Sequence, residues 1–197
     1  MDNLEIYKLT PDRLDDYLYF FENVAHTDNK QWDRCYCLDY CSASNAHLSK
    51  EFDDADVRRK YAIEYVNKGI IQGYLAYYNN QPVGWLNAND RDKCTNCMGM
   101  QEDIFNFKKI KMSDKKIKSI FCFTVAPEMR GKHIAQALLE RAIEDAKADG
   151  YEYMEAYPNK KDADIYYNYV GPMGLYNKFG FEKYGKTKYR FILRKKL

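Results

Sequence analysis

One stretch decides how this chain folds: Val125-Ala126-Pro127-Glu128-Met129-Arg130-Gly131-Lys132-His133-Ile134-Ala135. Before it, Ser119 to Val125 is an almost unbroken apolar run, as expected for a strand buried on both faces. After it, apolar residues recur at helical spacing to about Asp149, and Gly150 follows as a C-terminal cap. The stretch is therefore expected to be a short basic loop between a buried strand and an amphipathic helix.

A loop of this kind is a candidate anion site. Its backbone N–H groups and the positive end of the following helix converge on one spot, which suits a phosphate or pyrophosphate. Arg130 and Lys132 would add positive charge there. A plain strand-to-helix connection with solvated basic residues is equally consistent with these residues alone.

Working outward from the loop, strands and helices alternate along the chain. Further strands are expected at Glu5–Leu9, Gly73–Tyr78, Pro82–Leu86, Tyr151–Tyr157 and Lys188–Leu193, and helices from Thr10-Pro11-Asp12 onward, over Asp54–Lys68 and shortly after Gly171-Pro172. A short strand near Cys35–Cys41 is left open, and Asn89 to Asp114 receives no assignment. Neither an internal repeat nor a break in composition is visible, so residues 1–197 are expected to form one mixed α/β domain.

Composition excludes several classes of protein. The 31 basic and 29 acidic residues give a formal charge of +2, which argues against a general nucleic-acid or membrane-surface binder. The N-terminus carries neither a basic nor an apolar leader region, and the sequence shows no run of the ~18 apolar residues that a membrane-spanning helix needs. A cytoplasmic protein with reduced cysteines is expected.

A second stretch, Gly174-Leu175-Tyr176-Asn177-Lys178-Phe179-Gly180-Phe181, completes a resemblance. Together with the loop it is similar to the GNAT superfamily of acetyl-CoA-dependent N-acetyltransferases, whose pyrophosphate motif is Gln/Arg-x-x-Gly-x-Gly/Ala. Arg130 and Ala135 match the outer anchors of that motif, whereas His133 stands where the family has its middle glycine. The resemblance covers roughly residues 118–193 well, and the first half only through the order of elements.

The resemblance implies a GNAT-like fold, with a mixed, mostly antiparallel sheet and helices on both faces. It implies acetyl-CoA as co-substrate, with its pyrophosphate at Arg130, Gly131, Lys132, His133, Ile134 and Ala135. The pantetheine arm would run along Phe123, Thr124 and Val125, where a main-chain N–H near Val125 would polarise the thioester carbonyl. A homodimer is also compatible with the family.

Acetyl transfer to an amine requires a general acid and a general base. The resemblance places Tyr176 at the leaving sulfur as the acid. Glu155, in the middle of a strand beside the expected cleft, is the candidate base, and a solvated strand residue or a structural hydrogen bond is the alternative for it. Glu22, His26 and Asp28 are rivals for that role, and a chain of water molecules is a further alternative.

The cysteines and aromatics leave other functions open. Cys35, Cys37, Cys41 and the pair Cys94/Cys97 invite a zinc interpretation, but only the pair has a usual ligand spacing, so reduced thiols are expected. Aromatic residues are candidates to line an amine pocket: Trp32, Tyr36, Tyr40, Tyr157, Tyr166, Tyr167 and Tyr169. The favoured function is N-acetylation of a small-molecule or peptide amine, with no nucleic-acid or membrane partner. A non-catalytic CoA sensor and a cysteine-based metal or thiol regulator are the alternatives.

Overall fold

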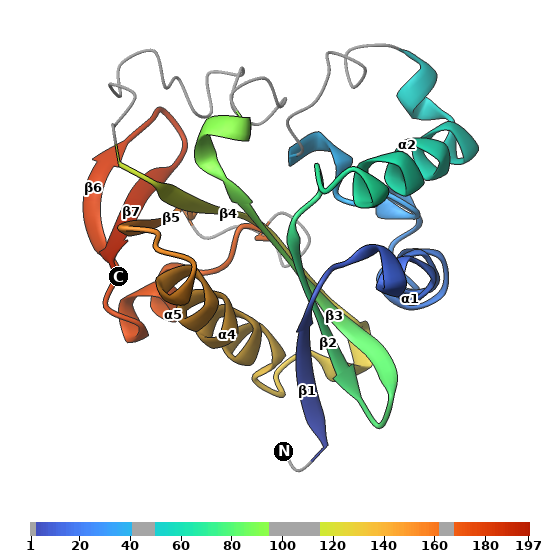
Figure 1. Ribbon diagram of the computed structural model, residues 1–197, viewed down its shortest axis with the longest axis horizontal. Coiled ribbons are helices and arrows are strands. Elements are labelled where there is room, and N and C mark those ends of the chain that lie inside the picture. The colour runs from blue at the N-terminus through green and yellow to red at the C-terminus, as the bar shows by residue number, and fades with distance from the viewer. Residues whose placement is uncertain (1–2, 41–49, 95–114, 162–167) are drawn as a thin grey trace.

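A twisted seven-stranded sheet forms the centre of the computed structural model, which describes residues 3–40, 50–94, 115–161 and 168–197 (Figure 1). The strands lie in the order β1-β2-β3-β4-β5-β7-β6. Their bounds are β1 Leu4–Lys8, β2 Gly73–Tyr78, β3 Gln81–Asp90, β4 Ile117–Val125, β5 Tyr153–Ala156, β6 Glu182–Lys186 and β7 Phe191–Lys196. All neighbouring pairs are antiparallel except β4 and β5, which are parallel. The expected fold class, a mixed and mostly antiparallel sheet, is confirmed.

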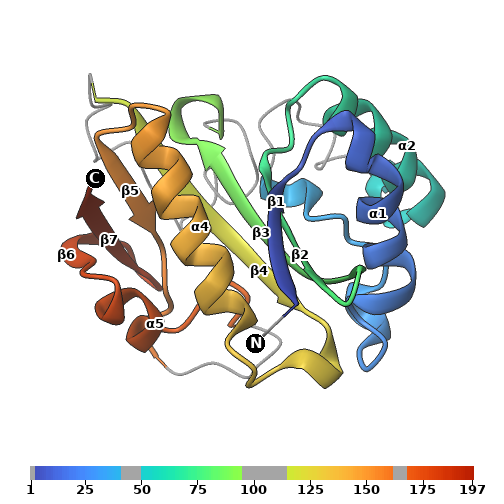
Figure 2. The ribbon, with the colours of Figure 1, turned by 60° about the horizontal axis from the view of Figure 1, so that its bottom comes forward.

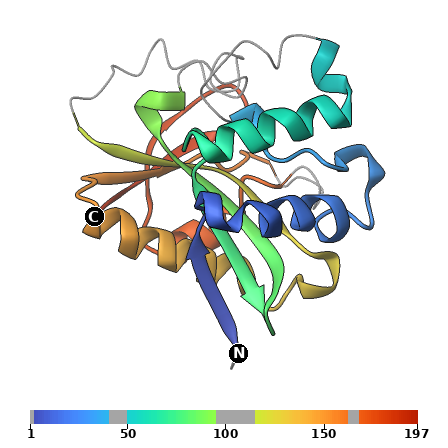
Figure 3. The same ribbon diagram turned by 45° about the vertical axis from the view of Figure 1, so that its right-hand side comes forward.

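Helices cover both faces of the sheet. On one face lie α1 (Leu14–Tyr19), which continues as a π-helical turn over Phe20–Val24, and α2 (Ala55–Asn67), and Figure 3 shows α1 and α2 side by side. On the other face lie α4 (Ile134–Ala148) and α5 (Met173–Lys178) (Figure 2). The sheet therefore separates two apolar cores, one under each pair of helices.

The alternation of side chains along the strands builds these two cores. In β3, Trp85 packs into the core under α1 and α2, while its neighbour Leu86 packs into the core under α4. In α4, Leu138 and Leu139 are fully buried against the sheet, as the helical spacing of its apolar residues predicts. Burial on both faces explains why β4 reads as a continuous apolar run.

Local chemistry accounts for the element ends. Asp54 caps α2, because its side chain accepts hydrogen bonds from the N–H groups of Asp56 and Val57. Asn79 and Asn80 join β2 to β3 with φ of 50° and 61°, the left-handed conformations that a two-residue hairpin turn requires. Asparagine tolerates this region better than most residues, so the Asn-Asn pair specifies the hairpin.

One irregularity in β4 opens the sheet. The pairing of β3 with β4 shifts between Asn87↔Cys122 and Ala88↔Ile120, which leaves Phe121 as an extra residue on β4. Such a bulge bends its strand. On the other edge, β4 pairs with β5 only as far as Ile120↔Ala156, and β4 then continues to Val125 with β3 as its strand partner. The bulge and the end of the parallel pairing coincide, so the two strands diverge beyond Ile120.

The structure departs from the sequence prediction at several strands. β3 runs to Asp90, four residues beyond the predicted strand Pro82–Leu86. The strand β6 was not predicted, because its side chains are mostly exposed and lack a clear apolar alternation. The last strand lies at Phe191–Lys196 rather than Lys188–Leu193. The optional strand near Cys35 is wrong for residues 35–40: Tyr36 and Cys37 have φ of 47° and 52°, which no strand allows, and a 3-10 turn over Leu38–Tyr40 follows.

Candidate functional site

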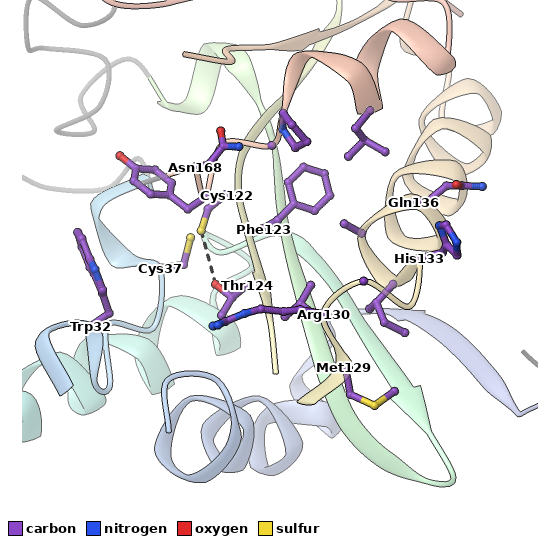
Figure 4. Close-up of a pocket in the computed structure, with 18 of the residues that line it drawn as sticks. Trp32, Cys37, Cys122, Phe123, Thr124, Met129, Arg130, His133, Gln136 and Asn168 are labelled. Carbon is purple, nitrogen blue, oxygen red and sulfur yellow. Dashed lines mark hydrogen bonds between the residues drawn. The ribbon is translucent and has the colours of Figure 1, made fainter. Parts of the chain in front are cut away.

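A cavity of about 790 Å³ lies where β4 and β5 diverge (Figure 4). Its walls come from the second half of β4, the loop before α4 with the first turn of that helix, α5 with the segment before it, and the turns between His26 and Tyr40. Of the predicted coenzyme residues, the cavity is lined by Phe123, Thr124, Val125, Arg130, Gly131, His133, Ile134 and Ala135. Lys132 is not among the lining residues; its Nζ lies 3.7 Å from the sulfur of Met129.

The loop and the first turn of α4 present backbone donors to one end of the cavity. The first hydrogen bond within α4 runs from the Ala137 N–H to the His133 carbonyl. The N–H groups of Ile134, Ala135 and Gln136 therefore have no acceptor within the helix. Because these three residues line the cavity, the positive end of a 15-residue helix faces it.

His133 occupies a conformation that normally belongs to glycine. It precedes α4 with φ of 64°, in the left-handed region, and makes no side-chain capping bond to the helix. A non-glycine residue there is strained by roughly 1 kcal/mol. The exposed imidazole points away from the Arg130 side of the cavity (Figure 4). The departure from the glycine motif is thus accommodated by backbone strain and by an outward side chain.

Two cations flank this end of the cavity, each held by a neighbour. Arg130 forms a paired contact with Asp28, with Nη1–Oδ2 at 2.5 Å and Nη2–Oδ1 at 3.3 Å. Lys178, on α5, donates to the Gln136 side chain at 2.7 Å. Lys178 and Gln136 were not predicted from the sequence, because only the fold brings α5 next to the start of α4.

The open edge of β4 supplies a second set of backbone donors. The Phe123 N–H points away from β3 and donates to the Tyr169 carbonyl at 2.6 Å, whereas the Ala126 N–H donates to Val83 on β3. Because backbone groups alternate along a strand, the Val125 N–H faces the same edge as that of Phe123. Both residues were predicted to contact the pantetheine arm. The Phe123 N–H is already bonded to the Tyr169 carbonyl, whereas Val125 lines the cavity.

Tyr176 lies beneath the cavity wall rather than in it. Its ring is fully buried beside Phe181 and Phe123, and its hydroxyl donates to the Val170 carbonyl. Gly171, with φ of 83°, lies between this hydroxyl and the cavity; a Cβ there would meet the Tyr176 oxygen at 2.8 Å. Burial raises the pKa of Tyr176, so the phenol keeps its proton at neutral pH.

Glu155 does not occupy the predicted place in the cleft. Its carboxylate is fully buried and lies between two guanidinium groups, with Arg194 Nε at 2.8 Å and Arg91 Nη1 at 3.2 Å. Tyr157 also donates to it at 2.9 Å. Glu155 does not line the cavity, and both its oxygens are engaged. The hypothesis that it acts as the base is therefore replaced by a structural role in a buried ion-pair cluster.

The rival bases have different surroundings. Glu22 accepts from the Tyr36 hydroxyl at 2.9 Å and from Arg59 at 2.8 Å, and Asp28 is paired with Arg130. Of the three rivals, His26 alone lines the cavity.

The aromatic and cysteine candidates divide between cavity and core. Trp32, Tyr40 and Tyr169 line the cavity, Tyr36 and Tyr157 are fully buried, and Tyr166 and Tyr167 lie outside the described residues. Cys35 lines the cavity, as do Cys37 and Cys122 (Figure 4). Cys94 is buried elsewhere, and Cys41 and Cys97 lie outside the described residues. Within the described part of the chain, three or more His, Cys, Asp or Glu residues do not cluster as metal ligands would.

Comparisons with known proteins agree with this geometry. The model of the acetyltransferase (GNAT) family matches residues 31–181. The solved PaiA N-acetyltransferase of Thermoplasma acidophilum, in complex with coenzyme A, is 17% identical with a TM-score of 0.55, covering 98% of this chain and 99% of that one. A GNAT acetyltransferase of Streptococcus pneumoniae is 16% identical with a TM-score of 0.56, covering 98% of this chain and 99% of that one. A ribosomal-protein-alanine N-acetyltransferase of Brucella melitensis is 16% identical with a TM-score of 0.53, also covering 98% of this chain and 99% of that one. A search of curated protein sequences gives no significant match.

The chain belongs to the GNAT acetyltransferase family, because the family model covers most of its length. The similar structures share its fold, and one of them holds coenzyme A. Among the described residues, the helices are too short or too polar to span a bilayer.

Proposed function

We propose that this protein is an N-acetyltransferase that moves the acetyl group of acetyl-CoA directly to a primary amine. The observation that carries the proposal is one cavity that joins the start of α4 to the open edge of β4. The first end suits the pyrophosphate, and the second suits an extended pantetheine arm that needs backbone partners.

Each wall of the cavity has a role in this proposal. The N–H groups of Ile134, Ala135 and Gln136 would hold the pyrophosphate, with Arg130 and Lys178 supplying charge. The Val125 N–H would donate to the arm or to the thioester carbonyl, stabilising the developing oxyanion. Acetyl-CoA supplies an activated thioester; the chain's own groups supply its orientation and the proton transfers.

Tyr176 is proposed as the acid that protonates the departing sulfur. Its hydroxyl lies against Gly171, a cavity-lining residue, and can approach that backbone closely because glycine has no Cβ, which would meet the Tyr176 oxygen at 2.8 Å. To donate, the hydroxyl has to turn from the Val170 carbonyl to the cavity. The raised pKa of Tyr176 keeps the proton on the phenol until the thiolate departs. Transfer then breaks the phenolic O–H bond and forms the S–H bond of CoA, and the phenolate takes up the second proton of the amine.

The acceptor is proposed to be a small-molecule or peptide amine that enters past Trp32, Tyr40 and Tyr169. Tyr169 contacts both of the other rings, with centroid distances of 6.2 Å to Trp32 and 5.8 Å to Tyr40. Aromatic faces attract an ammonium group, and Asp39 adds a carboxylate to the same wall.

A non-catalytic coenzyme sensor is the second candidate. The observation in its favour is that the Phe123 N–H and the Tyr176 hydroxyl are both engaged by carbonyls of the segment 169–170. In a sensor these bonds would persist when coenzyme binds, whereas in an enzyme at least the Tyr176 bond must break.

Two measurements separate the candidates. Calorimetric titration with acetyl-CoA tests the coenzyme site, and release of free CoA thiol across a panel of alkylamines, amino acids, polyamines and peptides tests transfer. Binding together with amine-dependent thiol release supports the enzyme. Binding without release for every amine supports the sensor, and absence of binding overturns both.

A further inference from the structure

His26 lies in the cavity wall but has no part in the coenzyme site or the acid step described above. It follows the π-helical turn after α1, and its half-buried ring lies 6.4 Å from that of Phe21. Its Nε2 lies 3.5 Å from the sulfur of Cys35, which also lines the cavity. Burial raises the pKa of Cys35 to about 12, so the thiol keeps its proton. Which of Nε2 and the sulfur donates in this contact depends on the imidazole tautomer. In the tautomer with Nε2–H, the ring donates to the sulfur and its Nδ1 keeps the lone pair.

Arg130 connects this histidine to the coenzyme loop. Asp28, two residues after His26, holds the Arg130 guanidinium through both of its oxygens. Arg130 is also the first anchor of the loop that faces the phosphate end of the cavity. A phosphate that binds there therefore changes the electrostatic surroundings of the His26 segment.

The charges around His26 define the direction of that change. Burial and the positive charge of Arg130 lower the pKa of His26 to about 4, while Asp28 and Asp33 act in the opposite direction. The ring is thus neutral at neutral pH, with a lone pair available, but it is a weak base. Coenzyme phosphates would neutralise Arg130 and remove one of the two causes that lower the pKa of His26, so its basicity would rise.

We propose that His26 accepts the proton of the incoming ammonium, and that coenzyme phosphates bound at Arg130 activate it for this step. The proposal rests on the proposed acetyltransferase function. The ammonium N–H bond breaks and its proton passes to the imidazole; the freed lone pair forms the C–N bond as the C–S bond of the thioester breaks. The second amine proton ends on the CoA sulfur through Tyr176, and the imidazolium releases its proton to solvent.

Cys35, Cys37 and His133 also line the cavity and fit this step less well, whereas the Asp39 carboxylate belongs to the wall proposed to attract the ammonium group. Cys35 and Cys37 are thiols whose pKa burial raises, so they hold their protons. His133 is exposed at the phosphate end, where it points away from Arg130 (Figure 4). His26 lines the same cavity, has its imidazole neutral at neutral pH, and lies close enough to Arg130 to be affected by its charge.

The first test follows the titration of His26 by NMR, with and without saturating CoA, and uses the His26→Gln variant to identify its signal. The pKa of His26 is expected to rise by about one pH unit or more when CoA binds. In Arg130→Met the pKa should already be raised without CoA and should change little when CoA is added. In the matched control Lys132→Met, which removes the other loop cation, the CoA-induced rise should remain.

The second test is kinetic. His26→Gln should lower turnover of an alkylamine by ~10²-fold at neutral pH, within the usual range for a lost general base. The loss should nearly vanish with trifluoroethylamine, which is largely unprotonated there, and a merely structural role would not produce this difference. The proposal is overturned if CoA binds but leaves the His26 titration unchanged, or if His26→Gln turns over the alkylamine within threefold of wild type. Failure of CoA to bind would instead refute the proposed function itself.

Discussion

Substitution of Glu155 by glutamine tests whether its buried cluster is structural. The side chains of Glu155 and Arg91 are 0% and 3% exposed, and that of Arg194 is 13% exposed. Glutamine keeps the shape and one acceptor for the Tyr157 hydroxyl, but it leaves two guanidinium groups without a counter-charge. Removing one partner of a buried ion pair costs about 3–5 kcal/mol. For a chain of 197 residues this predicts a fall in Tm of roughly 10 °C, at about 2–4 °C per kcal/mol.

Urea unfolding followed by circular dichroism measures this loss directly. The matched control is Glu152→Gln, three residues earlier. Glu152 also pairs with a cation, the Lys115 ammonium at 2.7 Å, but the side chains of Glu152 and Lys115 are 46% and 52% exposed. Exposed pairs contribute about 0–1 kcal/mol, so the control should unfold almost as the wild type does.

The same variant separates the two roles of Glu155 kinetically. If the structural role holds, the pH profile of turnover per folded molecule keeps its acid limb, the fall in rate at low pH, when it is measured well below the lowered Tm. A loss of unfolding free energy below about 1 kcal/mol, combined with disappearance of that limb, would refute the structural reasoning and restore Glu155 as the base.

Three further changes have defined outcomes. His133→Gly should relieve the left-handed strain and let phosphate approach the backbone, so acetyl-CoA should bind several-fold more tightly by calorimetry; weaker binding would show that the imidazole is itself a ligand. Tyr176→Phe should lower turnover by ~10²-fold while acetyl-CoA affinity stays within threefold of wild type, and unchanged turnover would remove Tyr176 from the mechanism. Burial lowers the pKa of Lys118 to about 8 from 10.5, so the unfolded chain binds more protons between these pH values and stability should rise with pH across that window. Urea unfolding at several pH values should show this rise in unfolding free energy, which is on the order of 3 kcal/mol. Lys118→Met should abolish the rise and stabilise the protein at pH 7. An unchanged dependence of unfolding free energy on pH would contradict the lowered pKa of Lys118.

Local sequence signals were enough to predict the elements that build the coenzyme end. The apolar run of β4, the glycine-containing basic loop and the periodicity of α4 depend on neighbours in sequence, and each lies where expected. The loop sequence also identifies His133 as a departure from the glycine of the family motif. Its backbone explains why a glycine is usual there, since the position requires a positive φ.

Features that depend on distant residues could not be read in the same way. Glu155 was interpreted as a base because its strand neighbours are aromatic, but its partners Arg91 and Arg194 are 64 and 39 positions away. Likewise, the bulge at Phe121 leaves no mark within an apolar strand, since every residue of the run is compatible with burial. The pairing of Asp28 with Arg130 spans 102 positions and follows only from the fold.

The bulge has a consequence for the mechanics of the whole domain. The sheet consists of two blocks, β1–β4 and β5–β7, whose strands join along a seam of four residue pairs between Ile117–Ile120 and Tyr153–Ala156. A ligand arm along the open edge of β4 would lengthen that seam and fasten the blocks together. By linkage, saturation at a hundredfold excess over Kd would then raise the cost of separating them by about 2.7 kcal/mol. Amide exchange in β7 should slow accordingly when coenzyme is added. The bound coenzyme would then stabilise the contact between the two halves of the sheet.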